Sequence, residues 1–215
     1  MLRAAVSEGD DEPRSGGRGG RLLARLNYLY LLMMLVVIAG ILTAAMVMQY
    51  VKGELPCPLC LLQRVALFGI AYGIIQNFRG RFSYQNTGIS LVFAVLLLIV
   101  ASRQTLLDIY PRPGHDYIGT AILGLHMPVW SVIIAATIIT AYALKLAILG
   151  GDEHLADYPA VEFPLLARLA DFGAAYVIVL CLINLGSVVV QCGFGECHTM
   201  GYKLIQSGLP GLWLK

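Results

Sequence analysis

Four of the five cysteines form two close pairs, and thiol pairs of this kind can carry disulfide exchange. Cys57 and Cys60 are separated by two residues, and Cys192 and Cys197 by four. A thiolate attacks a disulfide through a mixed disulfide, so two pairs in one chain could pass a disulfide from one to the other. Cys181 lies inside an apolar stretch, where a thiol behaves as a small hydrophobic side chain. The pattern predicts a relay between two reactive pairs and an inert fifth cysteine.

The first pair stands where an apolar helix is expected to begin. Pro58 suits the first helical position, so Cys57 would lie near the N-cap and Cys60 in the first turn. Free backbone N–H groups and the helix dipole stabilise a thiolate there. We therefore expect Cys60 to be the electron-donating thiolate.

Arg64 follows Cys60 by four residues, which places both on one helix face, about 6 Å apart along the axis. The arginine could snorkel to the interface and only anchor the helix. Alternatively, its guanidinium could stabilise negative charge on a thiolate or on an acceptor molecule. The adjacent thiols favour the second interpretation.

The second pair follows the last apolar stretch and encloses two glycines. These allow a tight bend, and a disulfide can close when the two Cα atoms approach to about 4.4–6.8 Å. Such a bond between Cys192 and Cys197 could simply staple the tail. A loose external tail also suits a disulfide that meets another protein and then returns to the membrane pair.

Metal binding is the competing interpretation of the four paired cysteines. Together with His198 they could form a tetrahedral zinc site. Zinc sites of this kind usually use extended soluble loops, whereas both pairs here adjoin apolar stretches. Leu61 stands where a c-type haem site needs histidine. We expect no metal.

The rest of the chain must place these residues in a membrane. Of 215 residues, 58% are hydrophobic and 13% charged, and the mean hydropathy is +0.75. A spanning helix needs about 20 apolar residues. The stretches that satisfy this requirement are Tyr28–Met48, Leu61–Phe78, Thr87–Leu107, Pro128–Leu149 and Leu169–Gln191. They predict an all-α integral membrane protein with residues 27–191 as a five-span domain, between a disordered tail (1–26) and a C-terminal tail (192–215).

The distribution of basic residues predicts the orientation, because cytoplasmic segments are enriched in Lys and Arg. With the N-terminal tail inside, the inner side holds Arg3, Arg14, Arg18, Arg21, Arg25, Arg79, Arg81, Lys145 and Arg168, and the outer side holds Lys52, Arg112, Lys203 and Lys215. Five crossings then bring both cysteine pairs to the outer face, which in a bacterial cell is the oxidising periplasm. A net charge of +2 without a basic, aromatic-rich stripe argues against nucleic-acid binding.

Three longer motifs resemble the disulfide bond formation protein B (DsbB) family, quinone-dependent membrane oxidases that reoxidise the periplasmic dithiol oxidase DsbA. They are Pro56-Cys57-x-Leu59-Cys60-x-x-x-Arg64-x-Ala66-Leu67-Phe68-Gly69, Ile109-Tyr110-Pro111 and Leu123-Gly124-Leu125-x-Met127-Pro128-x-Trp130. The first is similar to the family signature, the second to the end of the third helix and the third to the start of the fourth.

The resemblance implies a four-helix bundle that holds ubiquinone or menaquinone at the outer ends of its helices. Cys57 and Cys60 match the quinone-proximal pair, with Cys60 as the thiolate that engages the ring, and Arg64 matches the arginine required for quinone use. The remaining matches are Met127 and Trp130 at the ring pocket, Gln104 where relatives carry a quinone-contacting histidine, and Arg103 at the arginine before it.

Two features depart from the family pattern. The second cysteine pair usually lies between helices three and four, but residues 108–127 contain no cysteine. A fifth span follows instead, with Cys192 and Cys197 after it on the same predicted side. We expect this tail pair to replace the missing loop pair in a five-helix variant.

The resulting prediction is a protein-dithiol:quinone oxidoreductase of the bacterial inner membrane that reoxidises a DsbA-like partner. One alternative is a reductase of the vitamin K epoxide reductase (VKOR) type, but its C-x-x-C is expected near the last bundle helix. Another is a structural or transport protein stapled by disulfides. Polar residues would then be expected through the middle of the membrane, where Lys145 and Asn184 are among the few present.

Overall fold

The computed structural model describes residues 18–53, 55–80, 82–110, 124–149 and 157–192. Its long helices are α1 (Arg18–Val51), α2 (Pro58–Arg79), α3 (Tyr84–Ile109), α4 (Met127–Leu149) and α6 (Pro164–Cys192), and the short 3-10 helix η1 (Ala160–Glu162) precedes α6. All five long helices have the length and composition to cross a membrane. The predicted all-α, multi-pass membrane fold is confirmed.

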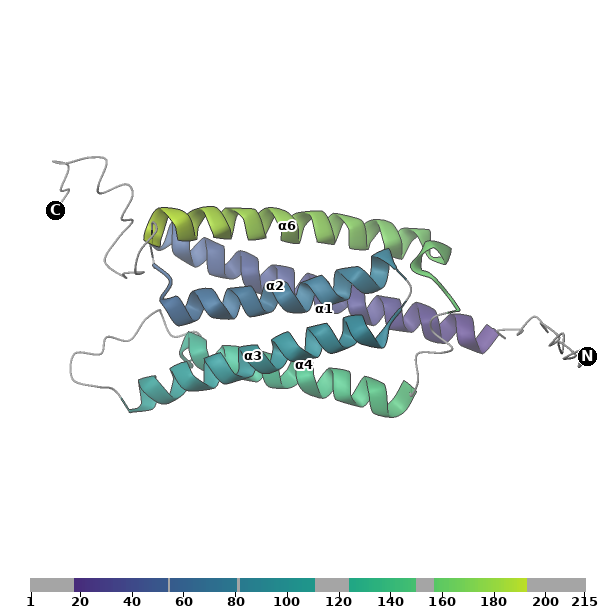
Figure 1. Cartoon of the computed structure of the whole chain (residues 1–215), viewed down its shortest axis with the longest axis horizontal. Helices are drawn as coiled ribbons and strands as arrows, with labels where there is room; N and C mark the ends of the chain where they lie inside the picture. Colours follow the sequence, from purple (N-terminus) through teal and green to yellow (C-terminus); the bar gives the residue numbers. More distant parts are fainter. Residues whose placement is uncertain (1–17, 54, 81, 111–123, 150–156, 193–215) are drawn as a thin grey trace, which may run out of the picture.

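The helices run side by side along the long axis of the molecule (Figure 1). α2 packs against α1, α3 and α6, while α3 also packs against α4, and α1 against α6. α2 begins and α6 ends at the same end of the bundle, and the N-terminus lies at the opposite end (Figure 1). This common end therefore receives both the Cys57–Cys60 turn and Cys192.

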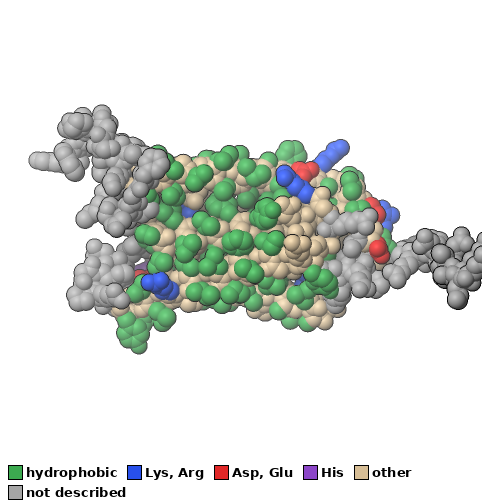
Figure 2. Space-filling view, in the orientation of Figure 1, with side chains coloured by type: hydrophobic (Ala, Val, Ile, Leu, Met, Phe, Trp, Pro, Cys, Tyr) green, Lys and Arg blue, Asp and Glu red, His purple; other side chains and the backbone are tan. Residues whose placement is uncertain are grey.

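The helices expose many apolar side chains and bury several polar ones within a hydrophobic core. Phe172 and Val92 are 74% and 68% exposed, whereas Gln49 and Gln191 are 2% and 1% exposed. Figure 2 shows hydrophobic side chains over the visible face, with most of the visible charged side chains toward the two ends. Such a surface suits hydrocarbon, and the buried polar groups must find partners inside the protein because lipid offers none.

α2 and α3 approach each other closely at Gly73. A Cβ added at Gly73 would lie 2.3 Å from the Ser90 Oγ and 2.5 Å from the Asn86 carbonyl oxygen, so only glycine fits there. The Ser90 hydroxyl donates a hydrogen bond to the Ile70 carbonyl, 3.0 Å away. Small residues at such contacts let membrane helices approach closely.

The predicted start of the first helix was wrong. α1 begins at Arg18, so the expected boundary at residue 27 falls within a helix. The segment before α6 explains why α1 starts earlier than predicted. Tyr158 lies against Gly20, and its carbonyl accepts a hydrogen bond from the Tyr28 hydroxyl at 3.1 Å. The rings of Tyr28 and Phe163 are 5.9 Å apart. This contact stabilises helix beyond the apolar stretch. The predicted tail residues 1–17 and 193–215 lie outside the described residues.

Candidate redox site

The candidate site is centred on a disulfide between Cys57 and Cys60 at the start of α2, with Cα atoms 5.0 Å apart. Cys57 is the N-cap of α2 and Pro58 its first residue, as predicted. The Cys57 sulfur accepts a hydrogen bond from the Cys60 backbone N–H at 3.1 Å. Cys57 is buried and Cys60 half-buried, so Cys60 is the more accessible half of the pair.

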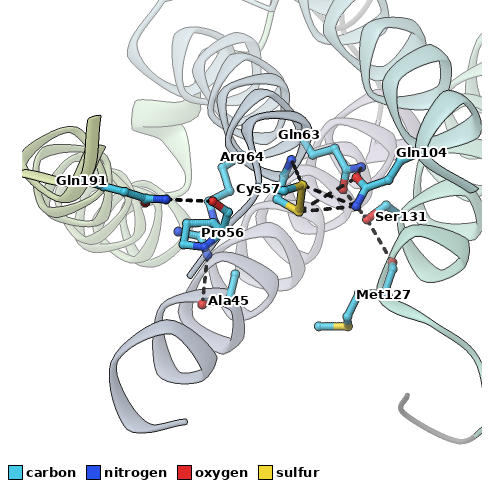
Figure 3. The surroundings of a disulfide bond; sticks show 10 residues. Ala45, Pro56, Cys57, Gln63, Arg64, Gln104, Met127, Ser131 and Gln191 are labelled. Carbon is cyan, nitrogen blue, oxygen red and sulfur yellow. Dashed lines mark hydrogen bonds between the residues drawn. A yellow bond between two sulfur atoms is a disulfide. The ribbon is translucent and has the colours of Figure 1, made fainter. Parts of the chain in front are cut away.

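A chain of side-chain hydrogen bonds connects the sulfurs to three helices (Figure 3). The Gln104 Nε2 on α3 donates to the sulfurs of Cys57 and Cys60, 3.5 Å from each. The Gln104 Oε1 accepts from the Gln63 Nε2 on α2 at 2.8 Å, and the Ser131 hydroxyl on α4 donates to the Gln63 Oε1 at 2.9 Å. Gln104 therefore contacts the disulfide directly.

Arg64 is 7% exposed and its guanidinium points toward α1 and α6. It donates to the Gln49 Oε1 at 2.6 Å, the Ala45 carbonyl at 3.1 Å and the Asn184 Oδ1 at 3.0 Å. These three acceptors are neutral dipoles, and no Asp or Glu is buried in the part of the chain that the structure describes. Arg64 thus lies one helical turn after Cys60 on α2, and its positive charge is buried among polar groups of α1 and α6.

The end of α6 is attached to the segment that precedes the disulfide. The Gln191 Nε2 donates to the Pro56 carbonyl at 3.0 Å (Figure 3). The next residue, Cys192, is buried, disulfide-bonded and the last residue of α6 instead of part of a tail. Cys197 lies outside the described residues. The sequence predicts that the two cysteine pairs lie at the same end of the bundle. Cys192 does lie there, because the residue before it, Gln191, contacts Pro56, which precedes Cys57.

The remaining predicted residues divide into two groups. Met127 and Trp130 are half-buried in the first turn of α4, and the Met127 carbonyl is a second, more distant acceptor for the Ser131 hydroxyl, at 3.3 Å. Arg103 is exposed and lines a groove of about 750 Å³ on the outer side of α3. Cys181 is a free, exposed thiol on α6. Met127 is thus linked to the site through Ser131, whereas Arg103 lies on the surface of the bundle.

The sequence prediction did not identify four polar residues that build the site. They are Gln49, Gln63, Ser131 and Gln191, and Asn184 was noted only as an isolated polar residue within a span. The usable signal is their occurrence within otherwise apolar stretches, because polar side chains in membrane helices are costly unless they find a partner.

Comparisons with known proteins show which family this part of the chain resembles. Residues 27–115, which include most of α1 and all of α2 and α3, match the family model of disulfide bond formation protein DsbB. The match covers less than half of the chain and shows that this segment is similar to the DsbB family. It contains Cys57, Cys60, Arg64 and Gln104, whereas α4 and α6 lie beyond the match to the DsbB model.

Individual relatives agree with the DsbB family model. The chain is 35% identical to disulfide bond formation protein B of Chromohalobacter salexigens, over 41% of this chain and 56% of the relative. It is 36% identical to the proteins of the same name from Acidovorax sp. (strain JS42) and Nitrosomonas eutropha, over 37% and 34% of this chain and 50% and 48% of the relatives. The chain thus spans about half the length of the curated relatives it matches. No solved structure matches it significantly.

Proposed function

We propose that the protein is a protein-dithiol:quinone oxidoreductase that reoxidises a DsbA-like dithiol oxidase in the periplasm. One observation carries the proposal. A disulfide caps a membrane helix within a segment similar to the DsbB family, and its sulfurs accept hydrogen bonds from a buried amide. A staple needs no such donor, whereas a pair that becomes a thiolate is stabilised by one.

The proposed reaction begins at the end of α6. A thiolate of the reduced partner attacks a disulfide between Cys192 and Cys197, and the second partner thiol then releases the partner in its oxidised form. The reduced tail pair exchanges with the Cys57–Cys60 disulfide in the same way, so that two electrons and two protons move to the helix pair. The contact between Gln191 and Pro56 supports this step, because it holds the base of the tail beside the Cys57 loop.

The electron acceptor is proposed to be ubiquinone or menaquinone, which supplies two-electron redox chemistry that no amino-acid side chain offers. The residues present fit such a group. Met127 and Trp130 offer half-buried apolar surface for a flat ring, Gln104 offers an N–H donor for a carbonyl oxygen, and Cys60 is the accessible sulfur. Arg64 supplies positive charge near this sulfur, supported by Gln49 and Asn184. Arg103 is exposed on α3 and lines the groove there, so the proposed arrangement gives it no contact with the quinone ring.

The proposed location is the bacterial inner membrane, with the N-terminus in the cytoplasm and both cysteine pairs at the periplasmic face. Arg21, Arg25, Arg79 and Arg168 belong to the end of the bundle opposite the disulfide, in line with the enrichment of basic residues in cytoplasmic segments (Figure 1).

The decisive experiment is a stopped-flow assay of the purified full chain with a reduced DsbA-like protein and a soluble quinone. We expect wild type to consume quinone, Cys60→Ser to abolish turnover and Arg64→Ala to raise the quinone concentration needed for half-maximal rate. Cys181→Ala is the matched control, because this thiol is exposed on α6 and outside both pairs. Wild-type protein that is inactive with every quinone tried would overturn the proposal.

The same assay tests the tail pair. Cys192→Ser with Cys197→Ser should abolish turnover with the protein partner while leaving quinone reduction by dithiothreitol intact, because a small dithiol can reach Cys60 directly. Normal reoxidation of the partner by this double variant would show that the tail pair does not replace the family's loop pair.

A further inference from the structure

The Gln104 amide is oriented by two residues that do not touch the sulfurs. Its Oε1 accepts from the Gln63 Nε2, and the Gln63 Oε1 in turn accepts from the Ser131 hydroxyl, at 2.8 and 2.9 Å. A side-chain amide carries its acceptor and its donors on two different atoms of one planar group. The Gln104 Oε1 lies 3.9 Å from the Cys60 sulfur, and the Nε2 is closer, at 3.5 Å from each sulfur. Each contact in the chain therefore fixes the orientation of the next amide, and the result is an N–H group of Gln104 directed at the cysteine pair (Figure 3).

The reversed orientation of Gln104 is disfavoured by burial. Gln63 and Gln104 are only 8% and 6% exposed. Turning Gln104 over would bring its NH₂ group against the NH₂ group of Gln63 and its carbonyl oxygen against the two sulfurs. Two buried donors would then lose an acceptor, and water cannot readily replace it inside a membrane bundle. Turning both amides would let the Ser131 hydroxyl accept from Gln63 and donate to the Met127 carbonyl, 3.3 Å away, but it would place the Gln104 carbonyl oxygen against two disulfide sulfurs that have no hydrogen to donate.

We propose that Gln63 and Ser131 are positioning residues that hold an N–H of Gln104 toward Cys60 and thereby stabilise the Cys60 thiolate after the pair is reduced. The inference rests on the proposed redox function of the Cys57–Cys60 pair. Reduction by a dithiol breaks the S–S bond and delivers two electrons and two protons, after which the Cys60 thiol releases one proton to the outer aqueous phase. A hydrogen bond to the resulting anion is stronger than one to a neutral disulfide sulfur. The chain therefore stabilises the reduced form and makes the disulfide a stronger oxidant.

The hydroxyl of Ser131 is tested by replacing it with threonine or with valine. These two side chains have nearly the same shape, and only threonine keeps the hydroxyl. The measurement is the equilibrium of the Cys57–Cys60 pair with glutathione redox buffers, read by alkylation of the free thiols in full-length protein whose other three cysteines are replaced. We expect S131V to lower the equilibrium constant for reduction about tenfold, because the charge-assisted bond is weakened but not deleted, and S131T to remain within about twofold of the serine protein. A tenfold change is about 30 mV for this two-electron couple.

A double substitution tests whether Ser131 acts through Gln63. With Gln63→Leu in place, the hydroxyl has no amide to orient, so adding S131V should change the equilibrium constant by less than about twofold. A merely structural effect of valine on α4 would persist in that background. Thr137→Val is the matched control, because the Thr137 hydroxyl on α4 bonds the Ile133 carbonyl at 2.8 Å, one turn back on its own helix. It should leave the equilibrium unchanged.

The possible results separate the two proposals. A wild-type protein that consumes quinone, combined with equal equilibrium constants for S131V and S131T, overturns the positioning role and leaves the oxidase function standing. An S131V effect that persists unchanged with Gln63→Leu overturns it as well. If the wild-type pair cannot be reduced by glutathione or by a dithiol protein, both proposals fail. Ser131→Ala, with the same expected loss as S131V, serves if the valine protein does not fold.

Discussion

Asn184 on α6 accepts a hydrogen bond from Arg64, and replacement of Asn184 by leucine removes this acceptor. The Asn184 Oδ1 lies 3.0 Å from a guanidinium nitrogen of Arg64, and the two residues are 5% and 7% exposed. Leucine has a similar size and cannot accept a hydrogen bond. The substitution therefore leaves the packing volume nearly unchanged and deprives a buried cation of one partner.

The size of the effect follows from how much Arg64 can recover. A hydrogen bond to a charged group contributes about 1.5–3 kcal/mol in soluble proteins. Polar contacts between membrane helices average about 0.6 kcal/mol and reach about 1.7 kcal/mol. Because Arg64 keeps its bonds to Gln49 and to the Ala45 carbonyl, part of the loss can be recovered by a small shift toward α1. We expect Asn184→Leu to lower the free energy of unfolding by about 1.5 kcal/mol, the upper part of the membrane range.

The assay is reversible unfolding in mixed micelles with an increasing fraction of sodium dodecyl sulfate, followed by far-UV circular dichroism. Ser187→Ala is the control, because the Ser187 hydroxyl also bonds α1, through Tyr50, without involving Arg64. It should cost about 0.6 kcal/mol, the average for such contacts, and leave the quinone requirement of turnover unchanged. Asn184→Leu should instead raise that requirement several-fold. The reasoning is refuted if Asn184→Leu is no less stable than Ser187→Ala and uses quinone as wild type does.

Three further substitutions test other parts of the structure. Gly73→Ala places a methyl group 2.5 Å from a backbone oxygen of α3 and should lower the free energy of unfolding by about 1–3 kcal/mol in the same titration, whereas Gly40→Ala, which meets no atom within 4 Å, should not lower it. Cys181→Ala should keep wild-type turnover in the quinone assay, and a loss of more than about twofold would contradict an inert role for this exposed thiol. Gln191→Leu breaks the bond to Pro56 and should slow turnover with a DsbA-like protein several-fold but not with dithiothreitol; equal slowing with both would place the defect elsewhere.

The membrane helices could be predicted because each requires a long apolar stretch, which can be recognised directly in the sequence. About 20 apolar residues are needed to cross the hydrocarbon, and all five such stretches became helices. The cap at Cys57 was also predictable, because proline at the next position favours a helix start. The start of α1 was not, since hydropathy reports the bilayer and not the packing of residues 157–163 against the first three turns of this helix.

The partners of the polar side chains could not be predicted. Arg64 was identified by its spacing from Cys60, which is a local relation. Its acceptor Asn184 is 120 residues away, and the bond that fixes Gln104 joins residues 41 apart. Which polar residues meet depends on the rotation of each helix about its axis. Packing sets this rotation, and apolar stretches with little amphipathic character do not record it.

The position of Arg64 indicates why the fifth helix belongs to the site. In a bundle of α1 to α4 alone, this guanidinium would keep its acceptors Gln49 and Ala45 on α1 but would lose Asn184 and the cover of α6, which is unfavourable for a cation within a membrane. α6 closes that side with Asn184 and attaches its last turn to the Cys57 loop through Gln191. The helix that supports the charge beside Cys60 is therefore also the helix that delivers Cys192 to the same end of the bundle. If the proposed relay is right, loss of α6 packing should impair quinone use and partner oxidation together, and the paired readouts for Asn184→Leu and Gln191→Leu distinguish these two effects.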